Sequence, residues 1–299
     1  MTNLTHSATI ELRKNDPTGS EASVKNEIYL STGCFTGRIN GRNPRLLADF
    51  YDQIECDGFE LMLFDDLYRN LDETIRSYVS LGIRIPVVHM NKRTGDFLSS
   101  PGDKNYDAAR ALIEQDLEIA RRVGARRAVF HPWGIPDSDR FSEMLLRRLS
   151  SLLAEYRGSD PELMPENCIC TSGSPLLHLR KLCAETGCHI TLDTRAAAFH
   201  AELNAQLSAF LPNGSVGHFH IIDYAGSPHD WEARSVIPQP GEGNVDFRAL
   251  FDAAQRADYR GSYTMESPHM LPDSVDVPLF NRSLAYIRRL AERNGEKPI

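Results

Sequence analysis

The chain has 299 residues, of which 41% are hydrophobic and 25% are charged, and its formal net charge is −8 at pH 7. These proportions are typical of a globular protein and exclude a collagen-like, low-complexity or mostly disordered chain. The apolar runs are far shorter than the roughly 18 residues of a membrane-spanning helix. The acidic balance argues against nucleic-acid binding through phosphate contacts, so we expect neither a membrane nor a nucleic-acid partner.

Residues 1–26 are polar and contain no apolar block, so they match neither a secretory signal nor a transit peptide. We expect them to form a flexible N-terminal extension, because they lack the apolar periodicity that a packed element requires. The six cysteines are scattered and form no CxxC pair, which is typical of reduced thiols in a cytoplasmic protein.

Short apolar runs alternate with amphipathic segments along the rest of the chain, and each run predicts a β-strand. The predicted strands cover residues 27–33, 58–63, 84–90, 126–131, part of 163–172, 189–194, 216–222 and 262–267. Asn43 with Pro44, Asn70 and Ser174 with Pro175 predict helix starts, and Gly82 and Gly187 predict helix ends.

Eight strand–helix units in about 270 residues predict a single-domain α/β protein, a (β/α)8 TIM barrel over residues 27–299. The alternative is a doubly wound sheet, which needs a phosphate-binding loop at its switch point. No GxGxxG or GxxxxGK[ST] sequence follows any predicted strand, and we therefore favour the barrel.

Polar side chains stand at or near the ends of five predicted strands, which is where barrels of this kind place their active sites. These residues are His89, His131, Asp193, the pair His218 and His220, and Glu266. If they point into the barrel they converge, and buried carboxylates and imidazoles are costly unless they are paired or hold a cation. The donor set suits a divalent metal, Mn²⁺, Mg²⁺, Co²⁺, Fe²⁺ or Zn²⁺, without choosing among them.

Seven segments occur in a characteristic order and together span most of residues 27–293. They are residues 57–61, His89, His131, residues 192–194, residues 218–223, residues 240–247 and Glu266. In this order they resemble the xylose-isomerase-like barrel superfamily of sugar-phosphate isomerases and epimerases, which also contains endonuclease IV. The resemblance implies a barrel and a metal held by four side chains, here Glu166, Asp193, His220 and Glu266.

The position of Glu166 depends on where the fifth strand lies. If the strand precedes Glu166, the carboxylate stands at the mouth of the barrel as the resemblance implies. If the strand instead covers residues 167–171, Glu166 lies at the opposite end and Thr171 takes the ligand position.

The chain departs from the superfamily after strand six, where Asp193-Thr194-Arg195-Ala196 replaces the usual Asp-Thr-Gly-His. The missing His makes the metal set of the nuclease incomplete. Arg195 either offers a fixed cation to an anionic substrate group or forms a surface ion pair.

The resemblance implies a metal-dependent isomerase or epimerase of a small sugar or keto-polyol, acting by proton abstraction next to a metal-polarised carbonyl. The candidate catalytic residues are Glu166, Glu266, His89 and His131, and the candidate substrate-binding residues are Glu60, Trp133, Arg195 and His218. The alternatives are a metal-dependent dehydratase or lyase, a degenerate barrel that serves as a binding module, and a repair nuclease, which the charge disfavours. The resemblance also leaves a homo-oligomer open.

Overall fold

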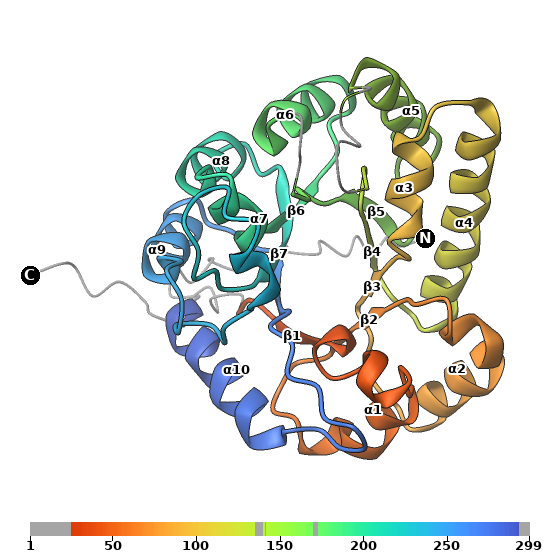
Figure 1. Ribbon diagram of the computed structural model, residues 1–299, viewed down its shortest axis with the longest axis vertical. Helices are drawn as coiled ribbons and strands as arrows, with labels where there is room; N and C mark the ends of the chain where they lie inside the picture. Colours follow the sequence, from red (N-terminus) through yellow and green to blue (C-terminus); the bar gives the residue numbers. More distant parts are fainter. Residues whose placement is uncertain (1–24, 135–139, 141, 170–172, 293–299) are drawn as a thin grey trace, which may run out of the picture.

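The computed structural model describes residues 25–134, 140, 142–169 and 173–292. Eight parallel strands form a barrel enclosed by helices (Figure 1), as the sequence predicts. The strands pair in the order β5-β4-β3-β2-β1-β8-β7-β6. Their bounds are Ile28–Ser31 (β1), Phe59–Met62 (β2), Val87–His89 (β3), Arg127–Phe130 (β4), Glu162–Pro165 (β5), Ile190–Asp193 (β6), Val216–Ile221 (β7) and Ser262–Met265 (β8).

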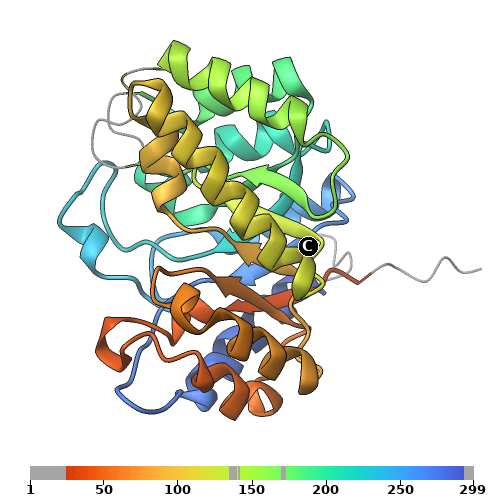
Figure 2. The ribbon, with the colours of Figure 1, turned by 90° about the vertical axis from the view of Figure 1, so that its right-hand side faces the viewer.

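The helices form the outer layer, and longer loops extend beyond the carboxyl ends of the strands. Figure 2 shows this end on the left, where the cyan loop with the 3-10 helix η6 (Ala233–Ser235) projects, whereas β1 enters from the right. The α-helices are Arg45–Phe50 (α1), Leu71–Ser80 (α2), Arg93–Ser99 (α3), Asp103–Arg122 (α4), Ser142–Glu155 (α5), Pro175–Thr186 (α6), Thr194–Phe199 (α7), Leu203–Phe210 (α8), Phe247–Arg256 (α9) and Val277–Ala291 (α10).

The barrel closes between β5 and β6 through a few contacts at the carboxyl end of β5. Glu166 forms an isolated parallel bridge with Thr191, and the backbone N–H of Asn167 donates to the Thr191 carbonyl at 3.3 Å. The Asn167 side chain donates to the carbonyl of Asp193 at 3.0 Å and accepts from its N–H. The seam therefore holds two of the predicted metal ligands side by side.

Alternation along the strands separates an apolar outer face from a mixed interior. Outward residues such as Leu30, Phe130 and Ile221 join one apolar core with the helices. Inside the barrel, Tyr29, Val87 and Val129 form a small cluster of their own. Fully buried polar residues also lie in the interior: Glu60, Thr191, His218, His220 and Thr264. Such a polar interior requires nearly every group to have a partner.

Local sequence signals explain several helix ends. The Ser174 hydroxyl accepts from the N–H of Leu177 at 3.3 Å, Pro175 opens α6, and Gly187 ends it with a φ of +67°. The predicted helix start and end are confirmed there. The helix start predicted at Asn70 is also confirmed, since α2 begins at Leu71. The capping box that the sequence Asn70-Leu71-Asp72-Glu73 indicates does not form, because a 3-10 helix, Leu67–Asn70, runs directly into α2 and no side chain caps it.

The structure also contains helices that the sequence did not predict. The short α3 precedes α4, and α7 begins immediately after β6, ahead of α8. The side chain of Asp193 caps α7 by accepting from the N–H of Ala196 at 2.6 Å. This capping hydrogen bond holds the Asp193 side chain in place at the mouth of the barrel.

A buried carboxyl group of α4 anchors the segment that follows β3. Asp116 accepts from the Tyr68 hydroxyl at 2.6 Å and from the N–H of Asn91 at 2.9 Å, and burial raises its pKa to about 6. We expect Tyr68→Phe to lower the free energy of unfolding by about 1–3 kcal/mol, because it removes a donor from a buried acceptor. Urea unfolding measures this loss. Tyr156→Phe is the matched control, since its partner Glu114 is exposed, and an equal effect of both would contradict the interpretation.

The described part of the chain contains no helix that is long and apolar enough to cross a membrane. Residues 1–24 lie outside the described residues, so the flexible extension stays a prediction for them. Asn26, the last residue of the predicted extension, donates hydrogen bonds to the carbonyls of Tyr259 and Gly261 at 3.1 and 2.8 Å.

Candidate metal centre at the mouth of the barrel

Glu166 stands at the carboxyl end of β5 and contacts three imidazoles. Its Oε2 atom accepts from Nε2 of His89 at 3.2 Å and lies 3.0 Å from Nε2 of His131, while Oε1 accepts from Nδ1 of His220 at 2.9 Å. Because β5 ends at Pro165, the alternative strand over residues 167–171 is wrong for the residues described there, 167–169. Thr171 lies outside the described residues.

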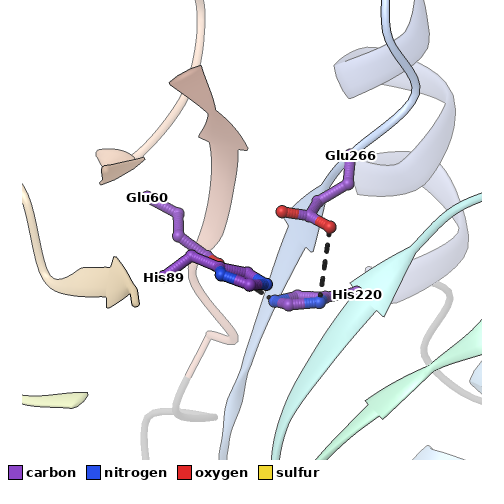
Figure 3. Close-up of side chains that lie close together, drawn as sticks. All are labelled: Glu60, His89, His220 and Glu266. Atoms are coloured by element: carbon purple, nitrogen blue, oxygen red, sulfur yellow. Dashed lines mark hydrogen bonds and ion pairs between the residues drawn. The ribbon is translucent and has the colours of Figure 1, made fainter. Parts of the chain in front are cut away.

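His220 of β7 is the centre of the group. Its Nε2 atom donates to Oε1 of Glu60 at 3.0 Å, and its Nδ1 atom also lies 3.4 Å from Oε2 of Glu266. Figure 3 shows Glu266 facing the His220 ring, with Glu60 and His89 on the other side of the view. The rings of His89 and His220 stack with centroids 5.6 Å apart. His220 therefore presents one nitrogen to the interior of the barrel and the other to the mouth.

The electrostatic balance of the cluster favours a positive charge. Burial and the neighbouring Glu166 raise the pKa of Asp193 to about 7. Burial also raises the pKa of Glu266, and the carboxylates of Glu60 and Glu166 add to this against the imidazole of His220. Burial alone would lower the pKa of His220, but Glu266, Glu60 and Glu166 hold it well above its usual range. These carboxylates stabilise a positive charge on His220. A bound divalent cation would balance their negative charges in its place.

The other two histidines differ in charge. Burial would lower the pKa of His89, yet its hydrogen bond to Glu166 and the surrounding carboxylates raise it. Burial lowers the pKa of His131 to about 4, which Glu166 only partly offsets, so its imidazole is neutral near pH 7. The pKa of Glu166 lies well below its usual range, because the charge of His220 and the hydrogen bonds to His131 and His220 outweigh the burial that would raise it.

Two overlapping sets of four residues bring ligand atoms within 4.8 Å of one another. One set contains Glu60, His89, His220 and Glu266, and the other contains Glu166, Asp193, His220 and Glu266. The second set suits a cation better. Glu60 contacts the Nε2 atom of His220, whereas Glu166 and Glu266 both contact Nδ1. One imidazole nitrogen can bind an ion while the other donates to a carboxylate, which fixes the tautomer and the ring orientation.

An orphaned atom supports the same assignment. Oε1 of Glu266 is buried and has no hydrogen-bond partner among the described residues. Three carboxylates and an imidazole from β5 to β8 are a donor set for Mn²⁺, Mg²⁺, Co²⁺, Fe²⁺ or Zn²⁺. The residues present therefore fit a divalent metal.

Three of the residues predicted to bind substrate are buried. Glu60 is fully buried, and its second carboxylate oxygen accepts from Nε2 of His218 at 3.1 Å. His218 is also fully buried, with Nδ1 2.8 Å from the Ser262 hydroxyl. Trp133 is 1% exposed and packs against His178 in the apolar core. The Glu60 carboxylate and the His218 ring nitrogens contact protein atoms, and the buried indole N–H of Trp133 has no hydrogen-bond partner among the described residues. A role of these three residues in substrate binding stays a prediction.

Sequence reasoning also overlooked residues that shape the mouth. Asn167 joins β5 to β6, as described above, and only its place in a Glu-Asn pair could have indicated this. Asp223 follows β7 and is fully buried; its carboxylate accepts from the N–H groups of Gly241, Gly243 and Val245 at 2.8–3.1 Å. These three hydrogen bonds fix the loop between β7 and α9. The Pro-Gly-x-Gly sequence that the carboxylate binds could have indicated them.

Comparisons with known proteins agree with the observed fold. The family model described as "Xylose isomerase-like TIM barrel" matches residues 46–290. No curated protein matches the sequence. A xylose isomerase domain protein from Alicyclobacillus acidocaldarius is 16% identical with a TM-score of 0.66, over 88% of this chain and 98% of the other.

Two other solved structures are similar over almost their full length. The D-allulose 3-epimerase from Methylomonas sp., in complex with D-allulose, is 16% identical with a TM-score of 0.66, over 89% of this chain and 97% of the other. The 3-keto-D-glucoside 4-epimerase from E. coli is 20% identical with a TM-score of 0.59, over 89% of this chain and 100% of the other. At these identities the likeness establishes the fold.

Proposed function

This chain belongs to the xylose isomerase-like TIM barrel family, and from that premise we propose that it is a metal-dependent isomerase or epimerase of a small sugar or keto-polyol. The observation that carries the proposal is the convergence of Glu166, Asp193, His220 and Glu266 at the mouth of the barrel. Two of the structurally similar proteins, the D-allulose 3-epimerase and the 3-keto-D-glucoside 4-epimerase, are sugar epimerases, which supports the proposal.

Glu166, Asp193, His220 and Glu266 would hold the metal. A divalent cation bound there supplies Lewis acidity, which polarises a substrate carbonyl and acidifies the neighbouring carbon-bound proton. Glu60 would orient the ligand by holding Nε2–H of His220. Asn167 would keep the backbone of Asp193 in register with Glu166.

Glu166 and Glu266 are the proposed proton carriers. They enter the mouth from β5 and β8, which are separated by β6 and β7 in the barrel. Inversion of a carbon by proton removal and return needs a carrier on each face of the substrate, and two carboxylates from separate strands can provide this. His89 and His131 both contact Oε2 of Glu166 and would hold that carboxylate in place.

Incubation of the metal-loaded protein with a panel of ketoses in D₂O tests the proposal. We expect one carbon-bound deuterium in an isomeric product of unchanged carbon skeleton, detected by mass spectrometry and NMR. Loss of water from the substrate would instead identify a dehydratase. Bound metal without exchange or conversion of any ketose in the panel would favour a binding module.

A conservative change of Asp193 tests the metal assignment. We expect Asp193→Asn to weaken divalent-metal binding on the order of tenfold, because the site loses one of its charged ligands. Asparagine can still cap α7, so the free energy of unfolding of the metal-free protein should change little.

Asp246→Asn is the matched control for this variant. Asp246 caps α9 in the same way, accepting from the N–H of Ala249 at 2.9 Å, but lies outside the cluster. Titration calorimetry with Mn²⁺ compares the two variants with the parent. Unchanged affinity in Asp193→Asn would contradict the ligand assignment.

A further inference from the structure

Two arginines from different elements lie together beside the candidate metal centre. Arg195 belongs to the first turn of α7, two residues after Asp193, and Arg234 lies in η6. Nη2 of Arg195 donates a hydrogen bond to the backbone carbonyl of Arg234. Figure 1 shows α7 next to β6 and β7, inside the ring of outer helices. The Arg195 side chain thus joins the rim at Asp193 to the loop that follows β7.

Neither guanidinium has an acidic partner within 4.0 Å in the described part of the chain. Nε of Arg195 and Nε of Arg234 are both buried and donate to no atom of the described residues. Two other partly buried arginines do have carboxylate partners: Arg42 lies 2.9 Å from Asp66, and Arg288 lies 3.1 Å from Asp57. Two adjacent cations that have lost part of their hydration and have no carboxylate within ion-pair distance are costly.

The groups around the two arginines support their side chains without neutralising them. The guanidinium of Arg234 lies over the Trp231 ring, 4.9 Å from its centroid. The neighbouring Asp230 carboxylate accepts from the backbone N–H groups of Glu232 and Ala233 at 3.0 Å. The Asp193 carboxylate attracts the Arg195 guanidinium, but it lies beyond ion-pair distance and is a proposed metal ligand. A bound anion would give the two arginines a closer counter-charge.

We propose that Arg195 and Arg234 form a subsite for a carboxylate or phosphate group of the substrate, next to the metal centre. Guanidinium groups present planar forks of N–H donors that match the oxygens of these anions. The inference rests on the proposed function and narrows it: the substrate is a sugar acid or a sugar phosphate, with its carbonyl and hydroxyl end at the metal ligands. Neutral sugars lack the group that the two arginines bind.

Anion binding by the metal-free protein tests the subsite separately from catalysis. The full-length protein is treated with a chelator and titrated with inorganic phosphate and, in parallel, with acetate, and binding is followed by calorimetry and thermal shift. We expect at least one of the two anions to bind and raise the melting temperature. Phosphate alone would identify a sugar phosphate, and acetate alone would identify a sugar acid.

The matched variants are Arg195→Gln, Arg234→Gln and the exposed control Arg45→Gln. We expect anion binding to be at least tenfold weaker in Arg195→Gln and in Arg234→Gln, and unchanged in Arg45→Gln. Arg195→Lys keeps the positive charge but loses the planar pair of N–H donors, so we expect it to lose part of the anion affinity. This conservative variant provides a test if Arg195→Gln fails to fold. Absence of binding by the parent protein, or equal binding by all variants, would overturn the subsite.

The metal readout distinguishes the two proposals. Mn²⁺ affinity should be unchanged in Arg234→Gln, because Arg234 contacts none of the four proposed ligands. If anion binding is lost in the variants while the protein shows no isomerase activity, the subsite stands and the proposed function fails. If the protein isomerises neutral sugars and binds neither anion, the function stands and the subsite is wrong.

Discussion

Glu166→Gln is expected to remove the bound divalent metal and to lower kcat/KM for the isomerised sugar by about 10³-fold or more. The substitution keeps the size of the side chain but removes the carboxylate charge that the imidazoles of His89, His131 and His220 all contact. An amide can accept from them at one atom only, since its nitrogen is a donor. Metal analysis and steady-state kinetics measure the two effects.

Glu162→Gln on the same strand is the control. Glu162 lies at the opposite end of β5 and pairs with the half-exposed His189 at 2.6 Å, far from the mouth. The same chemical change there should leave metal content and kcat/KM close to those of the parent protein. If Glu166→Gln also retained its metal, the proposed ligand set would have to exclude β5.

Glu60 provides the second large effect, through the fully buried histidines that it holds. Glu60→Ala should lower the free energy of unfolding by about 3–5 kcal/mol, because it removes the buried carboxylate that the Nε2 atoms of both His218 and His220 contact. Chemical denaturation of the metal-free protein measures this loss. A value below about 1 kcal/mol would show that water replaces the carboxylate.

Glu60→Gln separates positioning from stability. Glutamine can still accept from His220 and donate to Nε2 of His218, whose pKa burial lowers to about 4, so that His218 is neutral. We expect a small change in stability but about 10- to 100-fold weaker metal binding, because the carboxylate that orients His220 has lost its charge. A purely structural role of Glu60 would leave metal affinity unchanged in this variant.

The positions at the carboxyl ends of the strands were predictable from the sequence. Asp193, His220 and Glu266 each stand at or next to the end of an apolar run, and period-two alternation places each on one face of its strand. Their convergence at the mouth then follows from the barrel. Arg195 was identified as a cation that differs from the superfamily pattern, while the absence of a carboxylate partner became visible only in the structure.

Other placements depended on depth and register, which a single sequence does not contain. Glu60 and Glu266 both follow the alternation of their strands. Glu60, however, lies deeper inside the barrel than Glu266, fully buried and in contact with His220. Trp133 follows β4 like a loop residue of the mouth, but it packs into the apolar core next to His178. Local pattern gives the face of a strand; the side chains packed above it decide whether a ligand can reach it.

The amino-acid sequence by itself determined the eight strand–helix units, because hydrophobic periodicity and helix caps are local properties of the chain. Tertiary structure alone decided that β5 ends before Glu166, because the seam with β6 selects the register through the bridge to Thr191 and the side chain of Asn167. It also brought Arg195 to Arg234, 39 residues apart in the chain, since only folding places α7 beside the loop after β7.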